Sequence, residues 1–391
     1  PFGEDINSFT PVQHPANDVN TDIVTTHFDY HSIDANLLKL DILGHDDPTM
    51  IRMMEDLTGL DAQTIPLDDQ SVMSLFKSTE ALGITPEDIG GCPLGCLGIP
   101  EFGTDFVIQM LIDTKPTSFS DLVRISGLSH GTDVWLGNAQ TLIEEGKATI
   151  STAICTRDDI MIYLINKGLE SELSFTIMES VRKGKGLKPE WEEEMKAHDV
   201  PDWYIWSCKK IKYMFPKAHA AAYVMMAYRI AYYKIFYPLA YYAAYFSIRA
   251  SAFSYELMCM GRERLEYYMA DYKKRSDSLS KKEQDTLKDM KIVQEMYARG
   301  YDFTAVDLYK AQAHRFQIVD DKLMPALDSI EGLGDKAADA VVLAARDGQF
   351  LSKDDFRQRT KVSKNVIDFM DDLHIFGDIP ESNQISLFDF Q

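Results

Sequence analysis

The chain has 391 residues, 45% of them hydrophobic, and a formal net charge of -21 at pH 7. Its length corresponds to roughly two or three domains of about 150 residues each. The acidity excludes a uniformly basic nucleic-acid-binding protein, because phosphate contacts depend on Lys and Arg. It does not exclude a local binding groove, since basic residues gather near 182–217 while much of the acidity falls in 46–61 and 368–378.

Cysteine usage and hydropathy indicate the compartment. Five scattered cysteines do not resemble a secreted disulfide framework. The longest apolar stretch, 218–248, contains Arg229, Lys234 and Pro238, which a membrane span would not readily carry. We therefore expect a cytoplasmic protein with no membrane segment. Because the sequence starts at Pro1 and reads like the middle of a domain, we also expect a fragment of a longer chain.

The first predicted elements are strands. Residues 1–45 contain short β-prone runs at 25–30 and 37–43, separated by polar residues. Asp47 and Pro48 then open a helix, with Asp47 as its N-cap.

From there to about residue 250, apolar residues recur mostly at helical spacing. The predicted helices cover 68–77, 104–114, 119–126, 158–167, 171–183, 189–198 and 201–214, followed by a long pair that breaks near Pro238. A charged helical segment follows at 255–300, and a small hairpin is expected around 316–319. A compact helical module is predicted at about 326–378, and residues 379–391 are predicted to form an extended tail. The fold class is therefore mainly α with a small α+β part.

Asp41 stands within the apolar run LLKLDIL, where a carboxylate is costly to bury unless something pairs with it. A divalent metal is one such partner, because Mg²⁺ prefers carboxylate oxygens and shares its shell with substrate phosphates. The alternative is an Asp at a strand end that caps the next turn.

Two basic clusters, at 181–188 and 209–219, lie in the helical region against the acidic background. Their Lys and Arg residues are suited to phosphates, and Tyr213 and Phe215 between them are suited to stacking on a base. The run from Ser129 to Thr132 (SHGT) is predicted to be a tight polar turn that offers donors to a triphosphate. A solvated face without a ligand is the alternative for either cluster.

The segment IEGLGDKAA, at 330–338, resembles a helix-hairpin-helix module. Gly332 and Gly334 permit a turn whose backbone N–H groups face outward, and the following helix adds its positive end. Together with Lys336, this hairpin would hold one DNA phosphate without reading the sequence. An ordinary helix–helix turn is the alternative.

The tail segment QISLFDF carries apolar side chains in a short polar stretch with no core of its own, as in peptides that dock in a partner's groove. It resembles the sliding-clamp-binding peptide of bacterial replication proteins, with Gln384, Ile385, Leu387 and Phe388 as the binding residues.

Several longer runs carry a more specific resemblance: NLLKLDILGHDDP at 36–48, GIPEFGT at 98–104, ISGLSHGTDVWLGNAQ at 125–140, ESVRKGKGL at 179–187 and KKIKYMFPKAHAAAY at 209–223. Together with the hairpin and the tail, they resemble the PolC-type alpha subunit of bacterial DNA polymerase III over essentially the whole chain. The resemblance implies the end of a nucleotidyltransferase-like palm at 1–48, fingers at 49–245, a duplex-binding region at 246–380 and a clamp-binding tail at 381–391.

The resemblance also implies chemistry: attack of a primer 3′ hydroxyl on the α-phosphate of a deoxynucleoside triphosphate at a two-Mg²⁺ site. Asp41 would match the third palm carboxylate, whereas the first two belong to an Asp-x-Asp motif that is not found here, so the isolated fragment is expected to be inactive. The implied partners are primer-template DNA, deoxynucleoside triphosphates, the sliding clamp and other replisome subunits. The candidate nucleotide- and DNA-binding residues are Ser129, His130, Arg157, Lys183, Lys185, Lys209, Lys210, Lys217 and His219.

Three further hypotheses stay open. A structural zinc would need four ligands to converge, for which the candidates are Cys92, Cys96, Cys155 and Cys208; isolated buried thiols are the alternative. The chain could also act as a non-catalytic DNA-binding module tethered to the clamp, or as a structural subunit in which Asp41 and the Lys clusters are inert.

Overall fold

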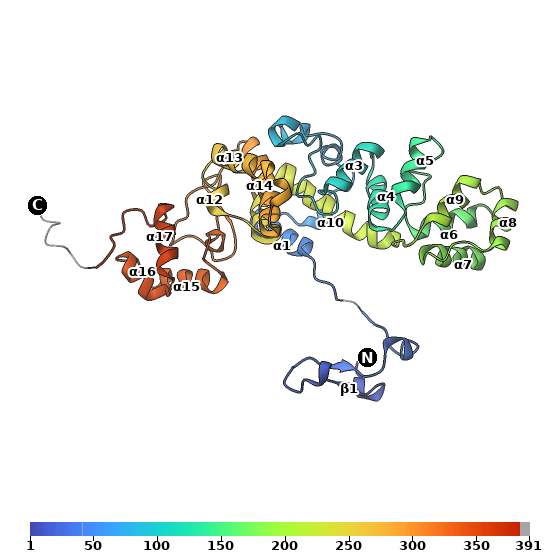
Figure 1. Ribbon diagram of the computed structural model, residues 1–391, viewed down its shortest axis with the longest axis horizontal. Coiled ribbons are helices and arrows are strands. Elements are labelled where there is room, and N and C mark those ends of the chain that lie inside the picture. Colours follow the sequence, from blue (N-terminus) through green and yellow to red (C-terminus); the bar gives the residue numbers. More distant parts are fainter. Residues whose placement is uncertain (41, 384–391) are drawn as a thin grey trace, which may run out of the picture. The chain divides into compact units, whose positions relative to one another are not determined.

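The computed structural model describes residues 1–40 and 42–383, and it is mainly helical (Figure 1). The chain divides into two compact units, Pro1–His45 and Asp46–Gln391. In the part of the chain described, no helix has both the length and the apolar character needed to cross a bilayer.

The first unit contains little regular structure. Strands β1 (Val12–Gln13) and β2 (Thr25–Thr26) pair antiparallel, with Val12 opposite Thr26. The prediction of a second strand at 37–43 is wrong for the residues described there, which form no strand and expose their apolar side chains; Ile42, for example, is 96% exposed. A strand needs hydrogen bonds from a neighbouring strand, and the described residues of this unit provide none for that run.

The second unit begins with α1 (Asp46–Thr58), which already contains Asp47, so the prediction of Asp47 as the N-cap is wrong. Asp47 is therefore within the first turn, buried, and its carboxylate is 3.1 Å from Arg249. The buried side chains of Met50, Met53 and Met54 follow helical spacing, so one face of α1 packs against α10 (Lys217–Phe236) and α11 (Pro238–Ala244). The predicted break at Pro238 is confirmed.

Most of the other predicted helices are present with shifted ends. They are α2 (Gln70–Ser74), α3 (Asp105–Thr114), α4 (Phe119–His130), α6 (Arg157–Asn166), α7 (Ser171–Arg182), α8 (Pro189–Ala197) and α9 (Asp202–Lys210), and a short α5 (Gln140–Glu144) was not predicted. Thr104 and Ser118 are the N-caps of α3 and α4, and their hydroxyls accept backbone N–H groups of the first turn.

Helix α9 ends four residues before its predicted end. Residues after Lys210 leave the helix because their backbone bonds elsewhere: the Lys212 N–H donates to the Thr132 carbonyl at 3.1 Å, and the Thr132 N–H donates to the Tyr213 carbonyl at 2.9 Å. This long-range pairing was not visible in the local pattern.

The charged segment forms α12 (Tyr255–Met258), α13 (Arg262–Lys274) and α14 (Lys281–Ala298). The predicted hairpin is confirmed as β3 (Gln317–Val319) and β4 (Lys322–Met324), which pair antiparallel. Helices α15 (Asp335–Arg346), α16 (Lys353–Thr360) and α17 (Lys364–Asp372) then pack together around a second hydrophobic core that includes Leu333, Val341 and Phe356 (Figure 1).

Candidate functional site

The basic helical region at residues 181–219 is organised around the loop at residues 211–216. Its Phe215 carbonyl accepts the N–H of Arg157, the first residue of α6, at 3.2 Å, and its Lys212–Tyr213 stretch pairs with Thr132 just after α4. The loop is therefore fixed to the end of α4 and to the start of α6.

Two glycines let other segments approach this loop closely. A Cβ on Gly184 would lie 2.6 Å from the Lys212 carbonyl oxygen, and Gly184 also has φ +71°. A Cβ on Gly131 would lie 2.9 Å from the Tyr213 carbonyl oxygen. The basic turn after α7, at residues 183–188, therefore lies directly against the loop. Only glycine fits such close contacts without displacing the backbone.

His130 faces the same loop from the last turn of α4. Its ring centroid is 5.5 Å from that of Phe215 and 6.2 Å from that of His219. One ring nitrogen is 2.9 Å from the Glu101 carboxylate, and the other donates to the Ser126 carbonyl at 2.7 Å. The Glu101 carboxylate, followed by the Ser126 carbonyl, outweighs burial and raises the pKa of His130.

The first turns of α6 and α10 are joined at this place. The Lys217 backbone N–H donates to the Asp158 carboxylate at 2.6 Å. The side chains of Arg157 and Lys217 form no ion pair with any described residue, so both charges are available to an anion. The Asp158 carboxylate already accepts the first N–H of α10, so the groups here that suit a phosphate are the Arg157 and Lys217 side chains.

The structure thus brings Ser129, His130, Arg157, Lys217 and His219 together around the loop. Ser129 and His130 are helical residues of α4, so the predicted tight turn at these two positions is wrong, and the chain leaves the helix only at Gly131. The Ser129 hydroxyl donates to the Ser126 carbonyl at 2.9 Å, a bond within the helix that local spacing favours over a turn.

The remaining candidate lysines differ from this group. Lys183 is 3.0 Å from Glu179, Lys209 is 2.8 Å from Glu192, and the Lys210 ammonium lies 4.5 Å from the centre of the Trp206 ring. Lys185 is exposed in the turn that holds Gly184 and has no ion-pair partner among the described residues. Lys209 therefore pairs with a carboxylate of α8, and Lys210 contacts an aromatic ring of α9. Lys185 belongs to the turn beside the loop.

Sequence reasoning missed Glu101 as the partner of His130 and Asp158 as the acceptor of the Lys217 backbone N–H. Glu101 has φ +70°, an uncommon conformation for a non-glycine residue. Its place in the run GIPEFGT was the available signal, but nothing in the sequence placed that run beside His130.

The four cysteines proposed for zinc do not converge. Within 1–40 and 42–383, the one group of three or more His, Cys, Asp or Glu residues close enough to share an ion contains no cysteine. Cys96, Cys155 and Cys208 are buried as free thiols, and burial raises the pKa of Cys96 to about 12. Because a structural zinc needs four converging ligands, these positions do not fit such a site.

Two predicted sites fall outside the described residues. Asp41, the predicted magnesium ligand, is one, and the clamp-binding residues Gln384, Ile385, Leu387 and Phe388 are the other. The structure therefore does not test either prediction.

The glycine hairpin has the expected turn. Gly332 has φ +89°, and a Cβ there would meet Val366 at 2.7 Å, while Gly334 is the N-cap of α15. Leu333 between them is buried, and Lys336 is exposed. The helix expected before the hairpin is reduced to a single 3₁₀ turn, η10 (Leu327–Ser329), because Pro325 precedes it and the backbone N–H groups of Leu327 and Asp328 bond to the loop at 312–313.

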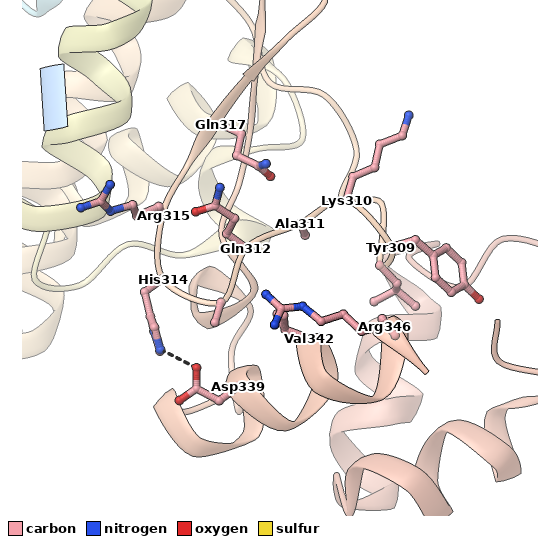
Figure 2. Close-up of a pocket in the computed structure, with 13 residues that line it drawn as sticks. Tyr309, Lys310, Ala311, Gln312, His314, Arg315, Gln317, Asp339, Val342 and Arg346 are labelled. Carbon is pink, nitrogen blue, oxygen red and sulfur yellow. Dashed lines mark hydrogen bonds and ion pairs between the residues drawn. The ribbon is translucent and has the colours of Figure 1, made fainter. Parts of the chain in front are cut away.

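A cavity of about 570 Å³ lies between α15 and the loop before β3 (Figure 2). Arg346 reaches from α15 toward the loop that carries Gln312, and His314 contacts Asp339 on the opposite side. Lys310 and Arg315 also line this cavity, which gives it a positive lining in an acidic chain.

Comparison with known proteins places these features in a family. Residues 47–199 match the bacterial DNA polymerase III alpha subunit finger domain, and residues 300–384 match a helix-hairpin-helix motif. The chain is 56% identical over 388 residues to a protein of Caldanaerobacter subterraneus named DNA polymerase III PolC-type, covering 99% of this chain and 28% of that protein. It is 57% identical over 384 residues to the Bacillus subtilis protein of the same name, covering 98% and 27%.

The chain therefore spans little more than a quarter of the length of the curated relatives it matches. The finger-domain match includes the C-terminal end of α4 and the start of α6, which hold the loop at 211–216. The second match includes the glycine hairpin. From these matches, the chain belongs to the PolC type of the bacterial DNA polymerase III alpha subunit family.

Proposed function

We propose that this chain takes part in template-directed DNA synthesis during bacterial chromosome replication, as part of a polymerase that adds deoxynucleotides to a primer 3′ end. The observation that carries the proposal is the convergence of Arg157, Lys217, His130 and His219 on one loop, beside the segment that matches the finger domain.

The proposed role of that group is to bind the triphosphate of the incoming nucleotide. Arg157 and Lys217 supply unpaired positive charge at two helix N-termini, and the Glu101 carboxylate favours the charged form of His130. These charges offset the negative charge that develops on the pyrophosphate leaving group. Tyr213, 45% exposed on the same loop, offers a ring on which a base can stack.

The other proposed roles follow the domain boundaries expected from the sequence. Residues 1–48 would complete a palm, with Asp41 and carboxylates outside this chain holding Mg²⁺, which would activate the 3′ hydroxyl and neutralise the phosphates. Residues 49–245 would be the fingers. The region 246–380 would hold primer-template duplex through the hairpin, and the tail at 381–391 would bind the sliding clamp. The whole polymerase would work in the cytoplasm together with other replisome subunits.

The decisive experiment uses the full-length polymerase that contains this chain. We expect Asp41→Asn to abolish primer extension while the Kd for primer-template changes little, because the substitution removes a metal ligand and no DNA contact. We expect Lys217→Gln to raise the KM for nucleotide by about tenfold or more. Lys196→Gln, which removes an equal charge from α8, is the control and should leave both quantities unchanged.

Near-normal extension by the Asp41 variant would refute the palm assignment and favour a non-catalytic, clamp-tethered DNA-binding module. An unchanged KM in the Lys217 variant would refute the triphosphate site, whatever the result at Asp41.

A further inference from the structure

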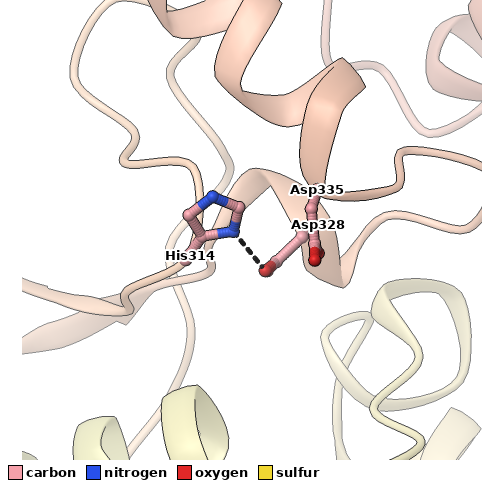
Figure 3. A group of neighbouring side chains, drawn as sticks. All are labelled: His314, Asp328 and Asp335. Carbon is pink, nitrogen blue, oxygen red and sulfur yellow. Dashed lines mark hydrogen bonds and ion pairs between the residues drawn. The ribbon is translucent and has the colours of Figure 1, made fainter. Parts of the chain in front are cut away.

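Three side chains from separate segments meet beside the glycine hairpin: His314 from the loop before β3, Asp328 from η10, and Asp335 from the first turn of α15 (Figure 3). One ligand atom from each lies within 4.8 Å of the others. The Nδ1 atom of His314 is 2.9 Å from the Asp328 carboxylate. A nitrogen and two carboxylate oxygens at this spacing form a ligand set for one cation.

A fourth residue, outside this ligand set, contacts the other side of the imidazole. The Asp339 carboxylate is 3.0 Å from His314 Nε2, one helical turn after Asp335 on α15. A carboxylate that accepts the N–H of one ring nitrogen leaves the lone pair of the other nitrogen facing the ligand set. Histidines that bind metals in proteins usually have this partner, which fixes the tautomer and the ring orientation.

The two carboxylates of the ligand set also need positive charge. A carboxylate oxygen of Asp328 and one of Asp335 lie within 4.8 Å of each other, so their negative charges repel unless a cation lies between them. A proton on His314 Nδ1 supplies one positive charge and pairs with Asp328 and Asp339. That state provides Asp335 with no ion-pair partner among the described residues, whereas a divalent cation would contact both carboxylates at once.

The position of the group matters for DNA. Asp335 directly follows Gly334, so the ligand set adjoins the backbone N–H groups that would bind a phosphate. The hairpin carries Glu331 and Asp335 but only one cation, Lys336. These acidic groups would repel a DNA phosphate unless their charge were neutralised.

We propose that His314, Asp328 and Asp335 bind one divalent cation of the Mn²⁺ type, with Asp339 as the positioning residue for His314. Two carboxylates suit Mn²⁺, and the imidazole nitrogen favours a transition metal over Mg²⁺ or Ca²⁺. Three protein ligands leave coordination positions open for water or for an oxygen of a DNA phosphate. The cation thereby joins the hairpin to the DNA backbone, and this second half of the inference rests on the proposed DNA-binding function.

The metal site is tested on the whole 391-residue chain without DNA. Mn²⁺ is added, and the unbound ion is measured by electron paramagnetic resonance. We expect one tight equivalent, an affinity loss of at least tenfold in His314→Gln, and a smaller loss in Asp339→Asn. His374→Gln, which changes another histidine of the same helical module, should bind like the wild type. The absence of a tight equivalent, or equal binding by the His314 and His374 variants, would overturn the proposal.

The bridging role is tested by adding a blunt DNA duplex to the same four proteins, with and without Mn²⁺. We expect Mn²⁺ to tighten duplex binding by the wild type and by His374→Gln at least fivefold, and to have little effect on His314→Gln. If the wild type binds duplex equally with and without Mn²⁺, the bridging role is wrong. If it binds no duplex in either condition while the Mn²⁺ equivalent is present, the proposed DNA-binding function fails and the metal site stands.

Discussion

The contact between Glu101 and His130 gives the first prediction at the residue scale. Because the Glu101 carboxylate raises the pKa of His130 in the folded chain, the proton on His130 stabilises the fold below the ordinary histidine pKa of about 6.5. That contribution to stability is lost as the pH rises through the raised pKa that His130 has in the folded chain. In Glu101→Gln, the pKa of His130 should fall, and unfolding should depend less on pH in this range.

The measurement is an NMR titration of the histidine rings in both proteins. His314 is the internal control, because its raised pKa depends on Asp328 and Asp339 rather than on Glu101. The same His130 midpoint with and without the Glu101 carboxylate would contradict the assignment.

Asp289, on α14, carries the second prediction at this scale. It is buried, accepts the Ala252 N–H at 2.9 Å, and burial raises its pKa to about 6. The folded chain then holds more protons than the unfolded chain between about pH 4 and pH 6, so stability falls as the pH rises through that window. Asp289→Asn should remove this loss, raising the free energy of unfolding at pH 7.5 by at most about 3 kcal/mol.

Urea unfolding at pH 4.5 and pH 7.5 measures the effect, which should shrink at the lower pH. Asp285→Asn is the matched control one turn earlier on α14, where Lys281 lowers the pKa of the carboxyl. Asp285→Asn should lower the free energy of unfolding at pH 7.5. If both variants raise it, the change in net charge explains the effect rather than the burial of Asp289.

At the scale of elements, a buried ion pair connects α10 to α14. The Lys234 ammonium is fully buried, donates to the Gly95 and Leu97 carbonyls at 2.8 and 2.7 Å, and is 2.9 Å from the Glu295 carboxylate. Lys234→Met would leave the Glu295 charge buried with only the Tyr242 hydroxyl as a donor. Because the described residues offer Glu295 no second cation in an ion pair, we expect a loss of roughly 3–5 kcal/mol in the free energy of unfolding.

The double variant Lys234→Met with Glu295→Leu is the control, because it removes both charges together. It should recover much of the lost stability in the same urea titration. A double variant less stable than Lys234→Met alone would show that Glu295 does not depend on Lys234.

The same elements show what the sequence could predict. Helices such as α3 and α7 follow from apolar spacing and from capping residues, which are local signals. The strand expected at 37–43 failed because pairing needs a neighbour that a local pattern does not provide. The pairs Lys234–Glu295, 61 residues apart, and Glu101–His130 depend on long-range packing. His130 was a candidate from the sequence, whereas Glu101 and the buried pair were not predicted.

At the scale of the whole molecule, a net charge of -21 must be reconciled with the proposed DNA binding. Charge acts locally at the salt concentrations of the cell, where the Debye length is about 8 Å. The hairpin and the positively lined cavity beside α15 are therefore the regions expected to contact phosphates, while the acidic surface elsewhere weakens nonspecific binding. The salt dependence of binding then reports the number of local contacts rather than the net charge.

The last prediction uses this dependence in the full-length polymerase bound to primer-template DNA. Plotting the logarithm of the binding constant against that of the salt concentration gives a slope of about -0.9 per phosphate contact. Lys336→Gln should make the slope shallower by about one contact. Lys196→Gln changes the net charge equally but lies on α8, so its slope should match the wild type. If both variants shift the slope alike, net charge governs binding and the hairpin makes no separate phosphate contact.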